Sequence, residues 1–285
     1  IDSWPSASQC CEAWYARDAM STLIARAYQA SQHWLALGHE SIAVPHARLV
    51  RDRGVPRIYD ANFAANVRAE SPGDIDAVLH EIDRAFDGFN HRHVLWDPET
   101  PPPFEARLVL DGWRQHNDLV TLVLEGDLQA TAPSAVIRAA ESDADWQTIE
   151  DLHWLDHEEE VAMGFHAPWD RTLTNELVAC KRRKSPDVRY FLAHVDGIDC
   201  AFFSAWPGRN GLGVIEDLFT RLEFRGRGIA TALIVACVDD ARARGADSIL
   251  VSARANDTPK HMYAAMGFRP LCVQRSYLKE RDPTK

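Results

Sequence analysis

Residues 218–231 combine the residue types and the spacing that bind a negatively charged group. A β-branched and aromatic strand is expected to end at Thr220, the basic turn Arg225-Gly226-Arg227-Gly228 follows, and a helix begins at about Ile229. Such a turn directs several amide N–H groups and the positive end of a helix towards one point, and the arginines favour a phosphate. Glycine is common in turns for steric reasons alone. The order of strand, turn and helix therefore carries the prediction of a phosphate-binding loop, which we call the glycine loop (residues 225–228).

The glycine loop does not match the common nucleotide-binding motifs. The sequence has neither Gly-x-x-x-x-Gly-Lys-Ser/Thr nor a Gly-x-Gly-x-x-Gly followed by an acidic residue about twenty positions later. Arg225 to Ala230 instead resemble the Arg/Gln-x-x-Gly-x-Gly/Ala signature of the GCN5-related N-acetyltransferases (GNAT). Ile215–Thr220 is similar to the central strand of that family. Asn256, Tyr263 and the run 266–268 (Met-Gly-Phe) are similar to its second motif.

This resemblance covers about residues 133–280 and implies a GNAT-like acyl-CoA-binding fold. It implies an acetyl-CoA-dependent N-acetyltransferase, in which a primary amine attacks the thioester directly. In the family the strand before the loop pairs with the pantetheine arm, and the loop with the first helical turn binds the diphosphate. The residues that the resemblance places against coenzyme A are Leu218, Phe219, Thr220, Arg225, Gly226, Arg227, Gly228, Ile229, Ala230, Thr231, Asn256 and Tyr263.

Acetyl transfer requires a neutral amine, a polarised carbonyl and a proton for the departing thiolate. Tyr263 matches the family tyrosine that acts as general acid, and the alternative is a helix aromatic packed on the sheet. Glu216 is the first candidate for the base, directly or through a water, and a salt-bridged structural carboxylate is the alternative. Asp217 would point to the opposite face of the strand. A weak base suffices, since good orientation alone is worth roughly 7–11 kcal/mol. Asn256 would bind the pantetheine arm or cap the next helix.

The resemblance places the acceptor site on the two helices expected within residues 143–184. Their acidic residues would attract a cationic amine, or would form a solvated helix end. Their aromatic residues would line an apolar pocket, or belong to the core. His153 and His157 have a spacing that can hold zinc, but the sequence places no third ligand, so we expect no metal. The acidic and aromatic residues concerned are Asp156, Glu158, Glu159, Glu160, Trp154, Phe165 and Trp169.

The composition limits the class of protein. A chain of 285 residues with 46% hydrophobic residues can form two domains with large cores. A net charge of −11 argues against a general nucleic-acid binder, and the apolar runs are too short to span a bilayer. The six cysteines follow no metal or disulfide pattern. We expect a cytoplasmic protein whose partner is a small-molecule or peptide amine.

The distribution of turn residues predicts two α/β domains. Residues 126–133 lack apolar periodicity, which separates an amino-terminal α/β domain (1–130) from the catalytic domain (133–285). We expect residues 57–65 to be extended and residues 268–278 to hold two closing strands.

An internal similarity links the two halves. Phe104–Leu124 and His261–Leu278 both read as a helix, a glycine with an aromatic residue, and a strand. The amino-terminal half is then a degenerate GNAT-like copy without a glycine loop, or the pattern is only a common helix-to-strand connection. This half could wall the acceptor cleft or form a homodimer. The alternatives for the whole chain are a non-catalytic acyl-CoA-binding module and a transferase of longer acyl groups.

Overall fold

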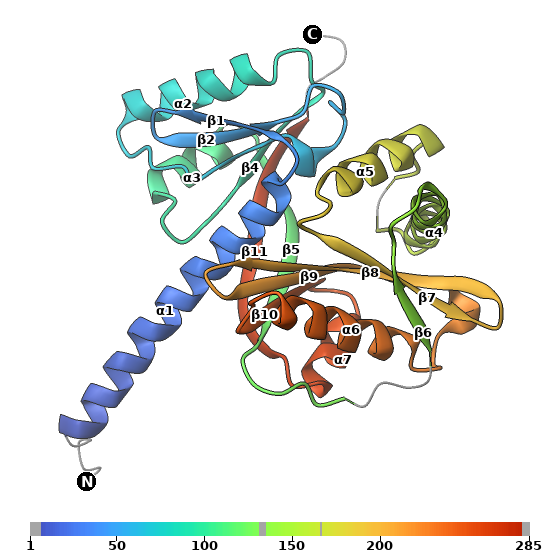
Figure 1. Cartoon of the computed structure of the whole chain (residues 1–285). Helices are drawn as coiled ribbons and strands as arrows, with labels where there is room; N and C mark the ends of the chain where they lie inside the picture. Colours follow the sequence, from blue (N-terminus) through green and yellow to red (C-terminus); the bar gives the residue numbers. More distant parts are fainter. Residues whose placement is uncertain (1–6, 131–134, 166, 281–285) are drawn as a thin grey trace.

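The structure, a computed structural model, describes residues 7–130, 135–165 and 167–280 and is a mixed α/β fold. All its strands belong to one 11-stranded sheet (Figure 1). The predicted fold class is therefore confirmed. Within the described residues, no helix is both long and apolar enough to cross a membrane.

The amino-terminal half begins with a long helix and continues as a hairpin followed by alternating strands and helices. Its elements are α1 (Ala7–Ala36), β1 (Glu40–Val44), β2 (Ala47–Arg51), the short 3₁₀ helix η1 (Tyr59–Ala61), β3 (Phe63–Ala65), α2 (Pro72–Ala85), β4 (His91–Leu95), α3 (Pro102–Leu110) and β5 (Arg114–Leu124).

The carboxy-terminal half has an additional strand and helix before the corresponding series. Its elements are β6 (Val136–Ala139), α4 (Asp143–Ala162), α5 (Arg171–Arg183), β7 (Arg189–Val195), β8 (Ile198–Arg209), β9 (Leu212–Thr220), the 3₁₀ helix η2 (Leu222–Phe224), α6 (Ile229–Ala243), β10 (Ser248–Arg254), α7 (Pro259–Ala265) and β11 (Arg269–Glu280).

The two halves exchange their last strands. The sheet order is β1-β2-β3-β4-β11-β5-β10-β9-β8-β7-β6, so β11 lies beside β4 and β5 lies beside β10. Each half contributes an antiparallel hairpin, then an antiparallel and a parallel neighbour, before it meets the exchanged strands. The order is thus symmetric about the β5–β11 pair, apart from the additional edge strand β6.

Local details repeat at equivalent positions of the two halves. The amide of Trp113 donates to Leu108 O at 3.0 Å, and the amide of Phe268 donates to Tyr263 O at 3.1 Å. The preceding glycines Gly112 and Gly267 both have positive φ, 80° and 96°. The internal similarity therefore extends from the sequence to the hydrogen bonding and the topology, as expected of a duplicated unit.

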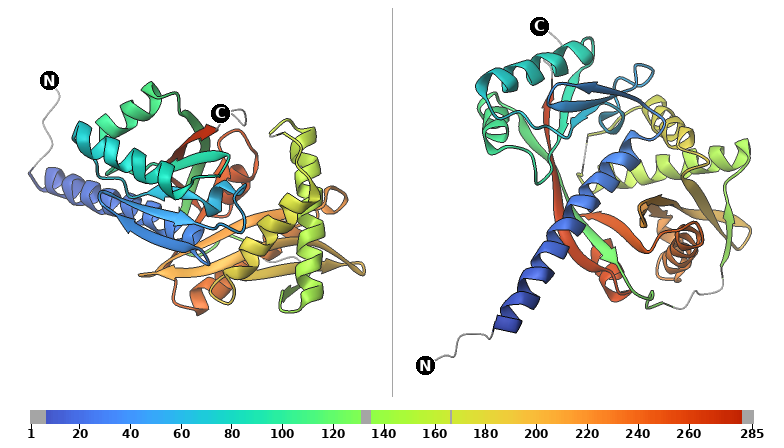
Figure 2. Two further views of the ribbon diagram at one scale, coloured as in Figure 1. Left: turned by 90° about the horizontal axis from the view of Figure 1, so that it is seen from above. Right: turned by 60° about the vertical axis from the view of Figure 1, so that its left-hand side comes forward.

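Helices cover both faces of the carboxy-terminal part of the sheet (Figure 1). Helices α6 and α7 pack on one face through Leu233, Val238 and Tyr263, whereas α1, α4 and α5 pack on the other. Helix α1 runs past the place where the two halves meet, and its first turns extend beyond the rest of the molecule (Figures 1 and 2). The strands of the carboxy-terminal half are thus enclosed between two helical layers.

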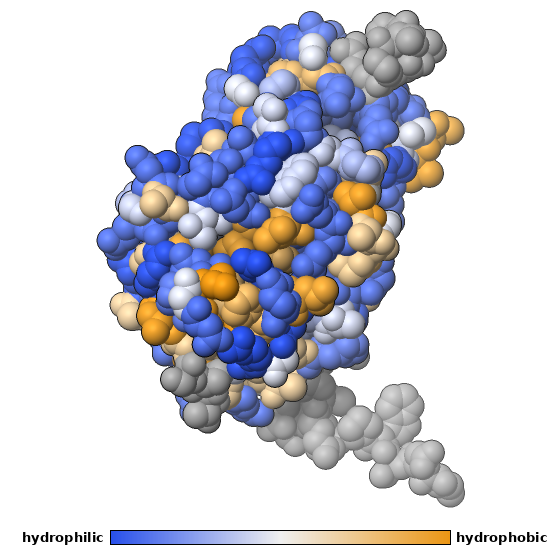
Figure 3. Space-filling model, turned by 90° about the vertical axis from the view of Figure 1, so that its right-hand side faces the viewer, coloured by the Kyte–Doolittle hydropathy of each residue, from blue (hydrophilic) through white to orange (hydrophobic). Residues whose placement is uncertain are grey.

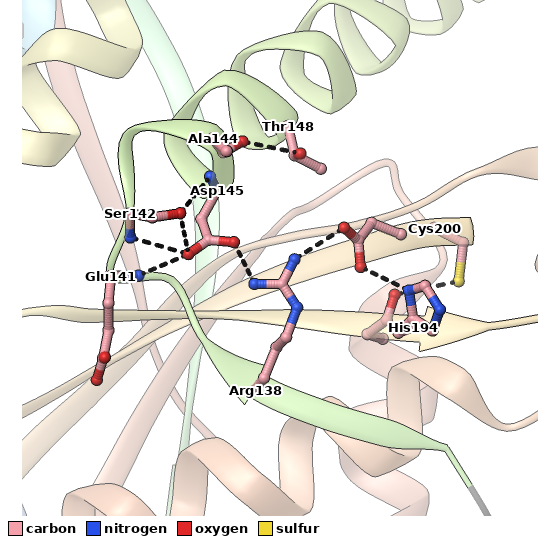
Figure 4. A network of polar contacts seen from close by, with 10 residues as sticks. Arg138, Glu141, Ser142, Ala144, Asp145, Thr148, His194 and Cys200 are labelled. Atoms are coloured by element: carbon pink, nitrogen blue, oxygen red, sulfur yellow. Dashed lines mark hydrogen bonds and ion pairs between the residues drawn. The ribbon is translucent and has the colours of Figure 1, made fainter. Parts of the chain in front are cut away.

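The start of α4 is fastened to the sheet edge by one arginine (Figure 4). Arg138 on β6 pairs with Asp145 and, at 2.8 Å, with Asp199 of β8. Asp145 also belongs to a capping box with Ser142, which satisfies amides at the helix start. Asp199 in turn pairs with His194 at 3.0 Å. This network sets where α4 leaves the sheet.

Two of the expected elements differ from the structure. Residues 57–65 are not extended throughout, because η1 precedes the short strand β3. Residues 268–278 do not hold two strands, since β11 is one strand with register shifts near Pro270 and Arg275. Pro270 has no amide hydrogen for the ladder, which accounts for the first shift. The division into domains at 126–133 stays a prediction, with residues 131–134 outside the described part of the chain.

Candidate active site

Strands β9 and β10 separate at the level of the predicted site. Their parallel pairing runs from Leu212–Ser248 to Ile215–Val251 and stops there, although β9 continues to Thr220 and β10 to Arg254. Beyond this point β9 pairs with β8 and β10 pairs with β5. An opening therefore lies between the two strands, where an extended chain with amide groups can pair with the free edge of β9.

The glycine loop lies at the end of this opening and directs free amides towards it. Gly226 and Gly228 have φ of 72° and 77°, a conformation that favours glycine. Gly228 caps α6 without a side-chain hydrogen bond, and no acidic residue stands in the first turn. Among the described residues, no acceptor is found for the amides of residues 226–231, and the first amide with a partner is that of Ala232. This arrangement is suited to a phosphate.

The two arginines of the loop are paired with carboxylates. Arg225 donates to Thr220 O at 2.7 Å and pairs with Glu159 at 2.5 Å. Arg227 pairs with Asp196 at 2.7 Å. Their charges are partly neutralised, so the backbone amides are the main groups of the loop that can donate hydrogen bonds to an anion.

Thr220 supplies a further sign of an absent binding partner. Thr220 is 8% exposed, and its hydroxyl oxygen is buried without a hydrogen-bond partner among the described residues. A buried hydroxyl without a partner is costly. Its place, where β9 ends and the loop begins, fits a polar group of a bound arm.

Glu216 reaches into the opening between the strands. Burial, and next the charge of Asp217, raise the pKa of its carboxyl to about 8, while hydrogen bonds from Ser252 on β10 act against this shift. A carboxyl with this pKa can both lose and gain a proton near neutral pH, as a general base requires. The structure shows no ion pair for Glu216 among the described residues, so the alternative of a salt-bridged carboxylate does not describe it.

The salt-bridged carboxylate is that of Asp217. It has a positive φ of 72° and lies where the β8–β9 register shifts. Its oxygens accept from Lys181 Nζ at 2.5 Å and from the Tyr190 hydroxyl at 2.7 Å. Burial alone would raise its pKa, but Lys181 and His153 outweigh burial and lower the pKa to about 2. Asp217 is therefore an ionised structural group on the α4–α5 face.

Tyr263 and Asn256 occupy different environments. Tyr263 on α7 is 3% exposed, and burial, followed by the charge of Glu216, raises its pKa well above the usual value. It therefore keeps its proton, and it packs against Phe268 as well as lying near Glu216. Asn256 is exposed in the turn before α7, whose N-cap is Thr258. Asn256 does not cap that helix and is available to a ligand.

Helix α4 presents acidic groups beside the site. Burial and Glu160 raise the pKa of Asp156 to about 8. Glu160 pairs with Arg254 at the end of β10 at 2.5 Å. A hollow of about 360 Å³ lies between α4 and the residues after β9, and its lining residues are Leu155, Glu158, Glu159, Ala162, Arg221, Leu222 and Glu223.

The two histidines with zinc-type spacing both pack against aromatic rings. His157 stacks on Trp169 with a centroid distance of 3.8 Å, and His153 packs on Phe202 at 4.5 Å. No group of three or more His, Cys, Asp and Glu residues in the described ranges is arranged to hold a metal ion.

Comparison with known proteins assigns the carboxy-terminal half. Residues 146–268 match the model of the Acetyltransferase (GNAT) family. These residues form a GNAT domain. The match includes the opening between the strands, the glycine loop and Tyr263, so family membership supports acyltransferase activity in general. No curated protein was found to match the chain.

Solved structures resemble the fold of the chain over most of its length. A GCN5-related N-acetyltransferase from Kribbella flavida has a TM-score of 0.65 at 16% identity, and the match covers 91% of this chain and 95% of that one. A functionally unknown conserved protein from Staphylococcus epidermidis gives 0.62 at 13% identity, with 86% and 95% covered. A tandem GNAT protein from the clavulanic acid biosynthesis pathway gives 0.56 at 16%, with 84% and 79% covered. The fold of both halves together is thus shared with GNAT proteins.

Proposed function

We propose that this protein is an acetyl-CoA-dependent N-acetyltransferase that acetylates a primary amine by direct attack on the thioester. The observation that carries the proposal is the opening between β9 and β10, which leads to the free amides of residues 226–231. The GNAT match over residues 146–268 supports the choice of an acyl-CoA thioester as donor.

The residues fit acetyl-CoA in three places. The amides of the glycine loop and of the first turn of α6 would hold the diphosphate. Leu218, Phe219 and Thr220 would lie along the pantetheine arm, with the unpartnered Thr220 hydroxyl as one polar contact. Asn256 would reach the arm from the opposite side, since its side chain is exposed in the turn after β10.

Two side chains would transfer protons during the reaction. Glu216, with its pKa near 8, would accept a proton from the incoming ammonium, directly or through a water. Tyr263 remains protonated and would donate to the departing sulfur. The charge of Glu216 contributes to the raised pKa of Tyr263, so the two side chains lie near each other, as a paired base and acid would require.

The acceptor would enter beside α4, over which carboxylates are concentrated. Glu158 and Glu159, which line the hollow, favour a cationic amine over an anionic one. The side of the molecule that lies to the right in Figure 1 also shows hydrophobic residues gathered within a hydrophilic rim (Figure 3). We propose a cytoplasmic location, in keeping with the free cysteines Cys180, Cys200 and Cys237. A homodimer stays a prediction.

Release of free thiol from acetyl-CoA, measured with a panel of amines, tests this function. We expect turnover with at least one cationic amine, and kcat/KM that rises with pH up to about 8, because Glu216 must lose its proton. Glu216→Gln should lower kcat by roughly 100-fold and abolish that pH dependence. Tight binding of coenzyme A without turnover on any amine would instead favour the non-catalytic module. Preference for a longer acyl-CoA would favour the third alternative.

A further inference from the structure

The connection between β2 and β3 lies against α5, the helix that borders the predicted acceptor site. We call residues 52–62 the brace segment. Its buried apolar side chains Val55, Ile58 and Ala61 form a small core with Cys180 of α5, and Leu173 and Leu177 pack on that core. An amino-terminal loop thus packs against one side of a carboxy-terminal helix.

Ion pairs hold α5 near both of its ends. Arg57 pairs with Asp170, the N-cap of α5, at 3.0 Å and with Glu176 at 3.2 Å. Asp52 pairs with Arg183 in the last turn. Exposed pairs add little free energy each, so their effect here is to fix the orientation of the helix.

The brace segment is itself held in one conformation by a buried asparagine. Asn62 is fully buried, and its side chain accepts from the amide of Asp52 at 2.7 Å. The same side chain donates to Val55 O at 2.9 Å and to Ile58 O at 3.0 Å. These bonds fold the segment back on itself and make it a rigid support.

Helix α5 transmits this support to the strand that carries the proposed base. Lys181, next to the brace contact Cys180, places Nζ 2.5 Å from Asp217. The side chains of Lys181 and Asp217 are only 9% and 16% exposed. A buried ion pair is favourable only in good geometry, so the position of α5 determines how well Asp217 is held. Asp217 is the left-handed residue that directly follows Glu216.

We propose that the amino-terminal half positions the catalytic strand, with the brace segment holding α5 so that Lys181 fixes Asp217 and thereby Glu216. Arg57 and Asp52 are positioning residues in this arrangement. The inference rests on the proposed function only for the role of Glu216. The mechanical connection from the brace segment to β9 stands on the contacts alone.

Amide hydrogen exchange on the full chain tests the connection without an acceptor. Arg57→Glu would repel both Asp170 and Glu176. Its matched control is Arg107→Glu on α3, since Arg107 also has two acidic partners, Asp76 and Asp111, and is similarly exposed, 35% against 37%. We expect exchange in residues 171–184 and in residues 214–220 to be about fivefold faster or more in Arg57→Glu, and unchanged in the control. Faster exchange in α5 alone, or equal effects in both variants, would overturn the proposal.

A double-mutant comparison then locates the coupling. In a Lys181→Met/Asp217→Asn background the ion pair is replaced without leaving a buried charge alone, and Arg57→Glu should no longer change exchange in β9. A persistent effect on β9 would mean that the route does not pass through Lys181. If Arg57→Glu does not fold, Arg57→Gln serves with the same controls.

Kinetics separates this proposal from the proposed function. With acetyl-CoA and an amine that is turned over, Arg57→Glu should lower kcat about tenfold, shift the pH dependence assigned to Glu216, and leave the Kd of coenzyme A within about twofold. Absence of turnover in the unmodified protein would remove the proposed function, while the exchange experiment would still decide the role of the brace segment.

Discussion

The N-termini of α6 and α2 occupy equivalent places in the two halves. They differ in whether the chain itself supplies hydrogen-bond partners for their backbone amides. At α6, Gly228 provides no capping side chain, and residues 226–231 keep free amides. At α2, the Ser71 hydroxyl accepts from the amide of Asp74 at 3.2 Å, and Pro72 has no amide hydrogen. The Asp74 carboxylate accepts from Ser71 at 2.7 Å. A helix start becomes an anion site only where the chain does not cap it itself.

The same contrast holds deeper in the two halves. Where the carboxy-terminal half has Tyr263, hydrogen bonding identifies Leu108 as the equivalent residue. The parallel pairs Ile215–Val251 and Ala64–Val94 are equivalent in the two halves. Asp217 lies two residues after Ile215 and Asn66 two residues after Ala64, and both have positive φ. The backbone irregularity is shared, whereas at these positions ionisable side chains occur only in the carboxy-terminal half. The comparison indicates that both halves share the backbone architecture, while only the carboxy-terminal half carries the side chains of the proposed chemistry.

The largest effect is expected from the glycine loop. Gly228→Glu should weaken coenzyme A binding by at least about 100-fold, because it places a negative charge and a strained left-handed residue beside the diphosphate site. Calorimetry on folded protein measures the Kd. Gly73→Glu, in the first turn of α2, is the counterpart and should leave the Kd within about twofold. Equal losses in both variants would contradict the difference drawn between the helices.

A smaller effect is expected at the equivalent pair Tyr263 and Leu108. Tyr263→Phe should lower kcat at least about tenfold with little change in coenzyme A affinity, since only the proton donor is removed. Leu108→Ala should leave kcat unchanged in folded protein but lower the free energy of unfolding by about 2–5 kcal/mol, because Leu108 is 1% exposed. Steady-state kinetics and denaturant titration measure the two. Unchanged turnover in Tyr263→Phe would remove its role as acid.

The smallest effect concerns a histidine cluster in the amino-terminal half. Burial, and then His93, lower the pKa of His91 and of His116 to about 4, and burial lowers the pKa of His93 too. The unfolded chain therefore binds more protons between pH 6.5 and about 4, so stability is full above pH 6.5 and decreases as the pH falls through this range. We expect a loss on the order of 1 kcal/mol per histidine.

Denaturant titrations at several pH values measure this loss. The charged groups around the cluster are Asp60, Arg92, Arg114 and Glu280, and Asp60 acts against the lowered values. His116→Leu should make the unfolding free energy less dependent on pH, because one of the neutral buried rings is removed. A pH dependence as steep as in the unmodified protein would show that the cluster does not control it.

The glycine loop could be predicted from sequence because its information is local. Two glycines with positive φ, a strand before them and a helix after them lie within a few residues. The same holds for the internal similarity around Gly112 and Gly267. The GNAT resemblance followed from these short segments and is confirmed for residues 146–268.

The supports of the site could not be predicted because they join distant residues. Lys181 belongs to a basic run that is typical of a helix end, and only the fold brings it to Asp217. The separation of β9 from β10 depends on β5 and β8 as neighbours, which no local pattern gives. The sequence shows only that two acidic residues, Glu216 and Asp217, are adjacent. Their different environments depend on the side chains that the fold places around each carboxyl group.

The exchange of β5 and β11 has a consequence for synthesis on the ribosome. Strand β4 needs β11 as its neighbour, and β11 is made long after the rest of the amino-terminal half. That half therefore cannot complete its sheet while it emerges, and a nascent chain exposes the edge of β4 until β11 arrives. Neither half of the polypeptide can finish folding without the other.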